Sequence, residues 1–135
     1  MYYNIADIEG IGPKYASKLA LAGIATSEDM LDLCSDPEGR EAVVEATGLG
    51  MEKILRWANL ADLMRINGIG PQFSELLEAA GVDTVKELRH RNAENLTLTL
   101  DDVNARRSLT RVTPASTTVA KWVERARQTK PRISY

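Results

Sequence analysis

Two copies of one short pattern decide the fold of this chain. Residues 8–14 read Ile-Glu-Gly-Ile-Gly-Pro-Lys, and residues 66–72 read Ile-Asn-Gly-Ile-Gly-Pro-Gln. The same spacing aligns further leucine, glycine and threonine positions. Later in each half the spacing grows, and there Trp57 aligns with Trp122. Because self-similarity of this extent indicates a duplicated structural unit, we interpret the second half as the first half with about seven residues inserted before its last helix.

Turn and cap residues around the two copies predict helices. The proline after each second glycine suits the start of a helix, and Gly23 and Gly81 are expected to end these helices as C-terminal caps. Thr84-x-x-Glu87 then predicts a capping box at the next helix start, and Thr26-x-x-Asp29 a near version of it. Further helices are expected from Asp36-Pro37 to just before Gly48, and from Thr113-Pro114 onward.

Two segments decide whether the chain is helical throughout. Residues 51–66 hold 10 apolar residues in 16, spread over most of a helical circumference, which predicts a buried helix between the two halves. Residues 96–100 alternate like a strand, yet Leu96, Leu100 and Val103 also form a helical stripe. Since no second strand is present to pair with it, we predict a helix here.

The expected architecture is therefore all-α, with two tandem repeated units packed around a shared central helix. We expect residues 1–62 to form the first, acidic unit and residues 63–129 the second, more basic one. Residues 130–135 are expected to be a frayed tail.

Composition narrows the class of protein. The chain has 135 residues, of which 44% are hydrophobic and 27% charged, as in globular proteins that fold without a metal ion or disulfides. Its one cysteine, Cys34, and the absence of Cys/His ligand spacing predict a reducing compartment and no metal site. We see neither a signal peptide nor an apolar run long enough for a membrane, and expect a cytoplasmic protein that does not bind membranes.

The net charge of −2 conceals an asymmetry. Residues 1–62 carry 5 basic and 11 acidic residues, a net charge of −6, whereas residues 63–135 carry 12 and 8, a net charge of +4. An aromatic content of 5% argues against a base-stacking platform.

A Gly-Ile-Gly turn between two helices offers a specific chemistry. The glycines can adopt backbone angles closed to other residues, while the apolar middle residue turns inward. The following helix then begins with free backbone N–H groups at the positive end of its dipole, which together form an anion site. A lysine one turn later, such as Lys14, would add a direct charge contact.

The residues that carry this chemistry resemble a known motif. Gly10-Ile11-Gly12-Pro13-Lys14 and Gly68-Ile69-Gly70-Pro71 resemble the helix-hairpin-helix motif of sequence-independent DNA-binding proteins, and Gly48-Leu49-Gly50-Met51-Glu52-Lys53 is similar to a further copy. The resemblance implies a tandem helix-hairpin-helix fold. It also implies that a monovalent cation can sit on the carbonyls of such a turn; no other cofactor is expected.

A second resemblance covers nearly the whole chain. Residues 91–96, 102–104, 111–114 and 119–126 resemble the domain-of-unknown-function 4332 family. Membership implies the fold and little about function.

Departures from the motif limit what the turns can bind. The fourth turn position reads Thr113-Pro114-Ala115, and proline lacks the N–H that a phosphate would need. The third turn is followed by Gln72 where the first has Lys14. Both turns that keep their glycines and a lysine lie in the acidic half, which opposes phosphate binding.

Two functions remain open. The first is weak, sequence-independent DNA binding through turn amides. Its candidate residues are Gly10, Ile11, Gly12, Lys14, Gly48, Leu49, Gly50, Lys53, Gly68, Ile69 and Gly70. A basic surface is also a candidate, formed by Arg106, Arg107, Arg111, Lys121, Arg125 and Arg127. The second is protein interaction or self-assembly through the acidic and basic halves.

For both functions, the same residues also have a purely structural interpretation. The glycines then only shape turns, and the charges are only solvated. No catalytic residues are expected, because the sole histidine, His90, has no partner that the sequence identifies.

Overall fold

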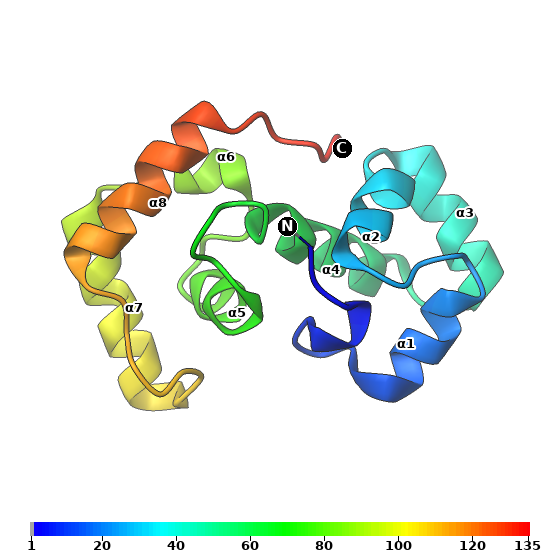
Figure 1. The fold of residues 1–135 in the computed structure, drawn as a ribbon, viewed down its shortest axis with the longest axis horizontal. Helices are drawn as coiled ribbons and strands as arrows, with labels where there is room; N and C mark the ends of the chain where they lie inside the picture. Colours follow the sequence, from blue (N-terminus) through cyan, green and yellow to red (C-terminus); the bar gives the residue numbers. More distant parts are fainter. Residues whose placement is uncertain (1) are drawn as a thin grey trace.

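The computed structural model describes residues 2–135, which form eight α-helices, one short 3-10 helix and no strand. The elements are η1 (Ile5–Asp7), α1 (Gly12–Ala20), α2 (Ser27–Cys34), α3 (Pro37–Thr47), α4 (Met51–Leu63), α5 (Pro71–Ala79), α6 (Val85–Leu88), α7 (Ala93–Arg107) and α8 (Ser116–Gln128). Figure 1 shows α1, α2 and α3 at one end of the molecule, α7 and α8 at the other, and α4 and α5 between them. The all-α prediction is confirmed, including the helix predicted for residues 96–100.

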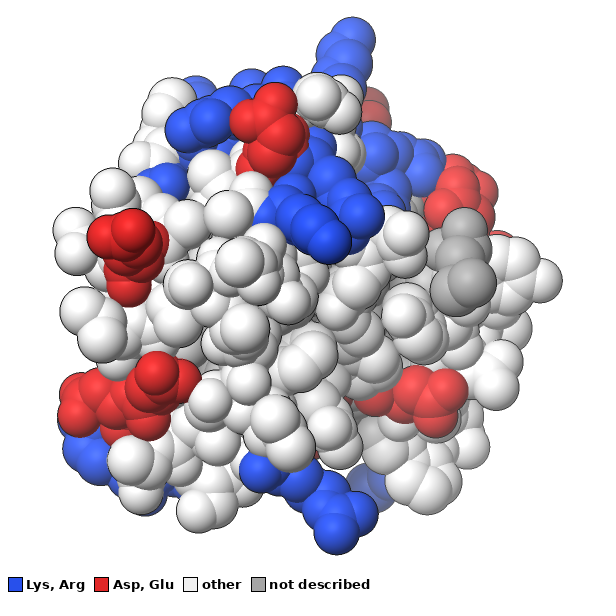
Figure 2. Space-filling view, turned by 60° about the vertical axis from the view of Figure 1, so that its left-hand side comes forward, with Lys and Arg blue, Asp and Glu red and all other residues white. Residues whose placement is uncertain are grey.

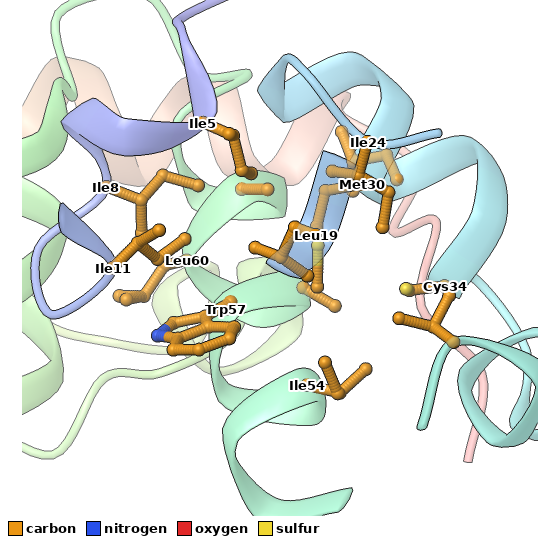
Figure 3. Close-up of a cluster of buried hydrophobic side chains, with 14 of the residues drawn as sticks. Ile5, Ile8, Ile11, Leu19, Ile24, Met30, Cys34, Ile54, Trp57 and Leu60 are labelled. Carbon is orange, nitrogen blue, oxygen red and sulfur yellow. The ribbon is translucent and has the colours of Figure 1, made fainter. Parts of the chain in front are cut away.

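Two hydrophobic cores fill the body, and α4 contributes to both, mostly to the first and through Leu63 to the second. The first core contains buried side chains from residues 5–64, and Figure 3 shows Trp57 and Leu60 of α4 facing Ile8 and Ile11 in it. The second core contains buried side chains from residues 63–126. Every residue from Trp57 to Leu63 is buried, as predicted for a helix that is apolar over most of its circumference.

The sequence repeat has a counterpart in the packing of aromatic rings. Tyr15 of α1 packs on Trp57 with ring centroids 5.4 Å apart and planes tilted by 53°. Phe73 of α5 packs on Trp122 of α8 at 5.2 Å and 54°. Both tryptophans are buried. Equivalent sequence positions therefore make equivalent contacts in the two halves.

Helix starts differ from the sequence prediction in three places. The complete capping box is at Thr26 and Asp29, since the Asp29 carboxylate accepts from the Thr26 N–H while the Asp29 N–H donates to the Thr26 hydroxyl. At Thr84 the hydroxyl accepts from the Glu87 N–H, and the structure gives no return bond between these two residues. Helix α8 begins at Ser116, two residues after the predicted Pro114.

Residues 130–135 cross from the end of α8 to α2 and α3 (Figure 1). Arg132 forms ion pairs with Glu28 at 3.0 Å and with Asp32 at 2.6 Å. Arg40 of α3, whose side chain is buried, donates to the Ser134 carbonyl oxygen at 2.7 Å. This arrangement differs from the frayed tail expected from the sequence, because charge and hydrogen bonds tie the tail to the first half.

None of the helices in residues 2–135 is both long enough and apolar enough to span a membrane.

Candidate functional site

The first and third glycine turns, Gly10–Gly12 and Gly68–Gly70, share one backbone design. The middle isoleucine of each is buried, and its N–H donates to a carbonyl three residues earlier, from Ile11 to Ile8 and from Ile69 to Ile66. This matches the inward-facing middle residue predicted from the sequence. The N–H groups of the four glycines have no acceptor among residues 2–135. They are therefore available to an external ligand.

A tryptophan lies directly beneath the first glycine of each of these turns. Gly68 has a φ of +98°, and a Cβ atom there would lie 2.9 Å from Trp122 Nε1. Gly10 has a φ of +89°, and its Cβ atom would lie 3.8 Å from Trp57 Nε1 and 3.0 Å from Arg56 Nη1. A side chain at position 68 would therefore meet both backbone strain and a buried ring, whereas one at position 10 would meet backbone strain and a guanidinium that can move aside.

The second glycine turn, Gly48–Gly50, uses its glycines differently. Gly48 ends α3 with a φ of +74°, and its N–H donates to the Val44 carbonyl. Gly50, the N-cap of α4, has a φ of −70°, which any residue can adopt, and a Cβ atom there would meet nothing within 4 Å. Neither backbone strain nor packing explains the glycine at position 50.

The starts of α1 and α4 lie side by side. Lys53 in the first turn of α4 places Nζ 5.8 Å from the ring centroid of Tyr15 in the first turn of α1. Lys14 precedes Tyr15, and both lysines are exposed. Lys53, which follows the second glycine turn, therefore lies near the helix start that follows the first glycine turn.

The third glycine turn has an acidic neighbourhood. An open cavity of about 470 Å³ lies beside this turn. The cavity is lined by Gly68 and Gly70 of the turn, and by Asp7 and Glu9, which precede the first glycine turn. Burial and the nearby Glu9 carboxylate raise the pKa of Glu75 above its usual value. The carboxylates of Asp7 and Glu9, which share a cavity with the third turn, would repel an anion bound there.

Another cation already occupies the carbonyl that precedes the third turn. Arg125 Nη1 donates to the Asn67 carbonyl oxygen at 2.7 Å. A monovalent cation on this oxygen would compete with a guanidinium, so the cation implied by the resemblance has no support at this turn. At the fourth position Pro114 is buried and Ala115 is the N-cap of α8.

Members of the predicted basic surface differ in whether they form ion pairs. Arg106 forms an ion pair with Asp102 within α7, and Arg127 forms one with Glu124 within α8. The remaining exposed members of this set form no ion pair within the described residues; they are Arg107, Arg111 and Lys121. The acidic partner Asp102 and its neighbour Asp101 both lie in the interior of α7, and neither is a helix-capping residue.

One gathering of basic side chains joins two members of the predicted basic surface, Arg125 and Arg127, to four residues that were not predicted. Figure 2 shows Lys and Arg along the edge where α6 and the end of α8 lie, above a centre of uncharged residues. A hydrogen bond from Arg89 after α6 to the Thr129 carbonyl after α8 joins the two segments at 2.7 Å. The basic residues of the two segments are Lys86, Arg89, Arg91, Arg125, Arg127 and Lys130. They meet only in the folded chain, so sequence proximity carries no signal of this edge.

In the described part of the chain, no group of three or more His, Cys, Asp or Glu side chains is arranged to hold a metal ion. Cys34 is buried, and this burial raises the pKa of its thiol to about 11. A thiol in that state is a poor nucleophile at neutral pH. His90 is exposed and lies after α6.

These features define an all-α protein of two similar helical halves, each with a glycine turn seated on a tryptophan. The family model described as "Domain of unknown function (DUF4332)" matches residues 9–129, so the chain belongs to this family, as its residues suggested. No curated protein and no solved structure matches the chain.

Proposed function

We propose that this protein binds the phosphate backbone of DNA weakly and without sequence preference, through the first two glycine turns of a tandem helix-hairpin-helix arrangement. In this proposal the amides that begin α1 and α4 bind phosphate oxygens, and Lys14 and Lys53 supply charge. The bare N-cap at Gly50 is the observation that carries the proposal, because neither backbone angle nor packing requires a glycine there. A glycine at this position lets a phosphate approach the helix start closely.

The expected affinity follows from the small number of cations. Two turns with one lysine each neutralise about two to four phosphates, so the logarithm of the binding constant is expected to fall with the logarithm of salt concentration with a slope of about −2 to −4. Exposed Glu52 and the half-buried Glu9 lie next to these turns and weaken the attraction further. Binding is therefore expected only at low salt.

The amide role is tested by placing a carboxylate at the N-cap. Gly50→Asp introduces a favourable N-cap residue, so the melting temperature is expected to stay the same or rise. The same carboxylate occupies the amides and repels phosphate, so duplex affinity in fluorescence anisotropy is expected to fall at least about tenfold. Ala115→Asp makes the equivalent change at the N-cap of α8 and is expected to leave binding intact. Equal binding by wild type and Gly50→Asp would refute the role of the amides.

The lysines are tested by charge reversal at matched positions. Lys14→Glu combined with Lys53→Glu is expected to abolish binding. Lys86→Glu combined with Lys121→Glu changes the charge equally at exposed positions outside the two turns and is expected to retain most of it. If the second pair removes binding and the first does not, the basic half is the nucleic-acid surface and the proposal fails.

A second candidate function is self-association. The observation that favours it is a row of exposed acidic residues on α3 and a group of exposed arginines around the loop after α7. Within residues 2–135 neither group forms an ion pair.

A further inference from the structure

We infer that this protein associates with further copies of itself head to tail, by inserting the loop after α7 of one copy into a groove between α1, α2 and α3 of the next. The inference gives the second candidate function its two surfaces and does not depend on DNA binding. It rests on an exposed apolar knob, an apolar groove, and opposite charges around them.

The knob is Val112, which is 75% exposed. It lies in the loop between α7 and α8, where the second half is longer than the first, and Arg106, Arg107 and Arg111 precede it. An exposed valine among arginines has no role in the core, since the structure places it outside both hydrophobic clusters.

Side-chain hydrogen bonds hold this loop in one conformation. Asn104 of α7 donates from Nδ2 to the Thr110 carbonyl at 3.0 Å and accepts from the Thr110 N–H at 2.9 Å. The Thr110 hydroxyl in turn donates to the Val112 carbonyl at 3.1 Å. A loop fixed in this way loses little conformational freedom on binding, which favours association.

The groove lies at the opposite end of the molecule. It has a volume of about 260 Å³, and its lining is small or apolar: Ala22, Leu33, Gly39, Ala42, Val43 and Ala46. Leu21 beside it is 74% exposed. Small residues on α3 leave room for a side chain the size of valine.

Acidic side chains beside the groove favour a basic partner. Glu38, Glu41 and Glu45 follow the outer side of the same helix, are exposed, and form no ion pair within residues 2–135. Arg107 and Arg111 around the knob are likewise exposed and unpaired there. An acidic, apolar groove and a basic, apolar knob on one chain are complementary between two copies.

The two surfaces lie at opposite ends of the molecule (Figure 1) and differ from each other, so a knob-to-groove contact between copies is heterologous. Knob-to-groove contact leaves a free groove at one end of a pair and a free knob at the other. Association is therefore expected to continue to larger species as concentration rises.

The test uses two blocked copies of the full chain. Val112→Asp blocks the knob, and Ala42→Lys blocks the groove; both positions are exposed, so neither change disturbs a core. In sedimentation velocity at about 20 mM salt, wild type is expected to grow in mass with concentration and to dissociate at about 0.5 M salt. Each variant alone is expected to be monomeric, and their mixture is expected to form dimers and nothing larger.

Tyr2→Asp is the matched control, because Tyr2 is 61% exposed and lies outside both the groove and the loop after α7; it is expected to associate like wild type. A wild type that stays monomeric at low salt up to about millimolar concentration, or a Val112→Asp variant that still associates, would overturn the inference. Neither result touches the DNA-binding proposal, since Val112→Asp is expected to bind duplex as well as monomeric wild type does.

Discussion

Replacing Gly68 with alanine is expected to lower the free energy of unfolding by about 2–5 kcal/mol. Two terms contribute. The φ of +98° is unfavourable for any residue with a Cβ atom, at about 1–2 kcal/mol. The new methyl group would also lie 2.9 Å from Trp122 Nε1, and forcing a buried ring to move costs about 1–3 kcal/mol.

Trp122 has little room to yield. It is 1% exposed and packs against Phe73 within the second core. Its indole N–H has no hydrogen-bond partner in the described residues, so no polar contact holds it in place, and the resistance comes from packing alone. For a chain of this size the loss corresponds to about 6–15 °C in melting temperature.

The two terms can be separated with a second glycine. Gly81 has a similar φ of +92°, but a Cβ atom there would meet nothing within 4 Å. Gly81→Ala is therefore expected to show only the strain term, about 1–2 kcal/mol. Urea unfolding of both variants, followed by far-ultraviolet circular dichroism, measures the difference. Equal losses for the two variants would refute the argument that the turn is seated on the tryptophan.

Three further predictions concern the tail, the cysteine and one carboxyl group. Arg132→Ala is expected to cost about 1 kcal/mol in urea unfolding at low salt and less at high salt, because its two ion pairs are partly exposed; an unchanged stability at low salt would contradict this. Cys34, with a pKa of about 11, is expected to react with a disulfide reagent at pH 8 at least about 100-fold more slowly in the folded than in the urea-unfolded protein, and equal rates would show that it is accessible. Since burial and Glu9 raise the pKa of Glu75 in the folded state, its ionisation costs stability as pH rises through that value. Glu75→Gln is thus expected to raise the melting temperature at pH 7 but not below about pH 3.5, where both forms are neutral, and a gain of equal size at both pH values would exclude this cause.

Local patterns in the sequence predicted much of this fold for physical reasons. The repeated Gly-Ile-Gly-Pro run fixes turn geometry through residues that have few alternatives, and the helical stripe at Leu96, Leu100 and Val103 outweighed the alternating pattern. The position of Gly50 at the start of a helix was likewise readable from its neighbours. What these features share is that the information lies within about one helical turn or one repeat.

Long-range polar contacts left no such signal. Arg40 and Ser134 are 94 positions apart, and nothing in either residue type predicts that the two form a hydrogen bond. The seating of Gly68 on Trp122, and the meeting of Lys53 with Tyr15, likewise depend on how helices pack once formed. The capping box was predicted at the wrong copy because an aspartate three residues after Thr26 reaches the backbone as well as a glutamate does.

The two proposals, if both hold, act on each other through multivalency. One copy offers two glycine turns with one lysine each, which makes a weak site. A head-to-tail row of copies would present such a pair at regular intervals, and each further pair would bind the same duplex at a high effective concentration. Duplex binding would then be cooperative for wild type. It would be non-cooperative for Val112→Asp, although the intrinsic site is the same in both. The insertion after α7 adds Val112, which lies outside both cores. By linking copies, it would raise the overall affinity for duplex while the residues that contact phosphate stay the same.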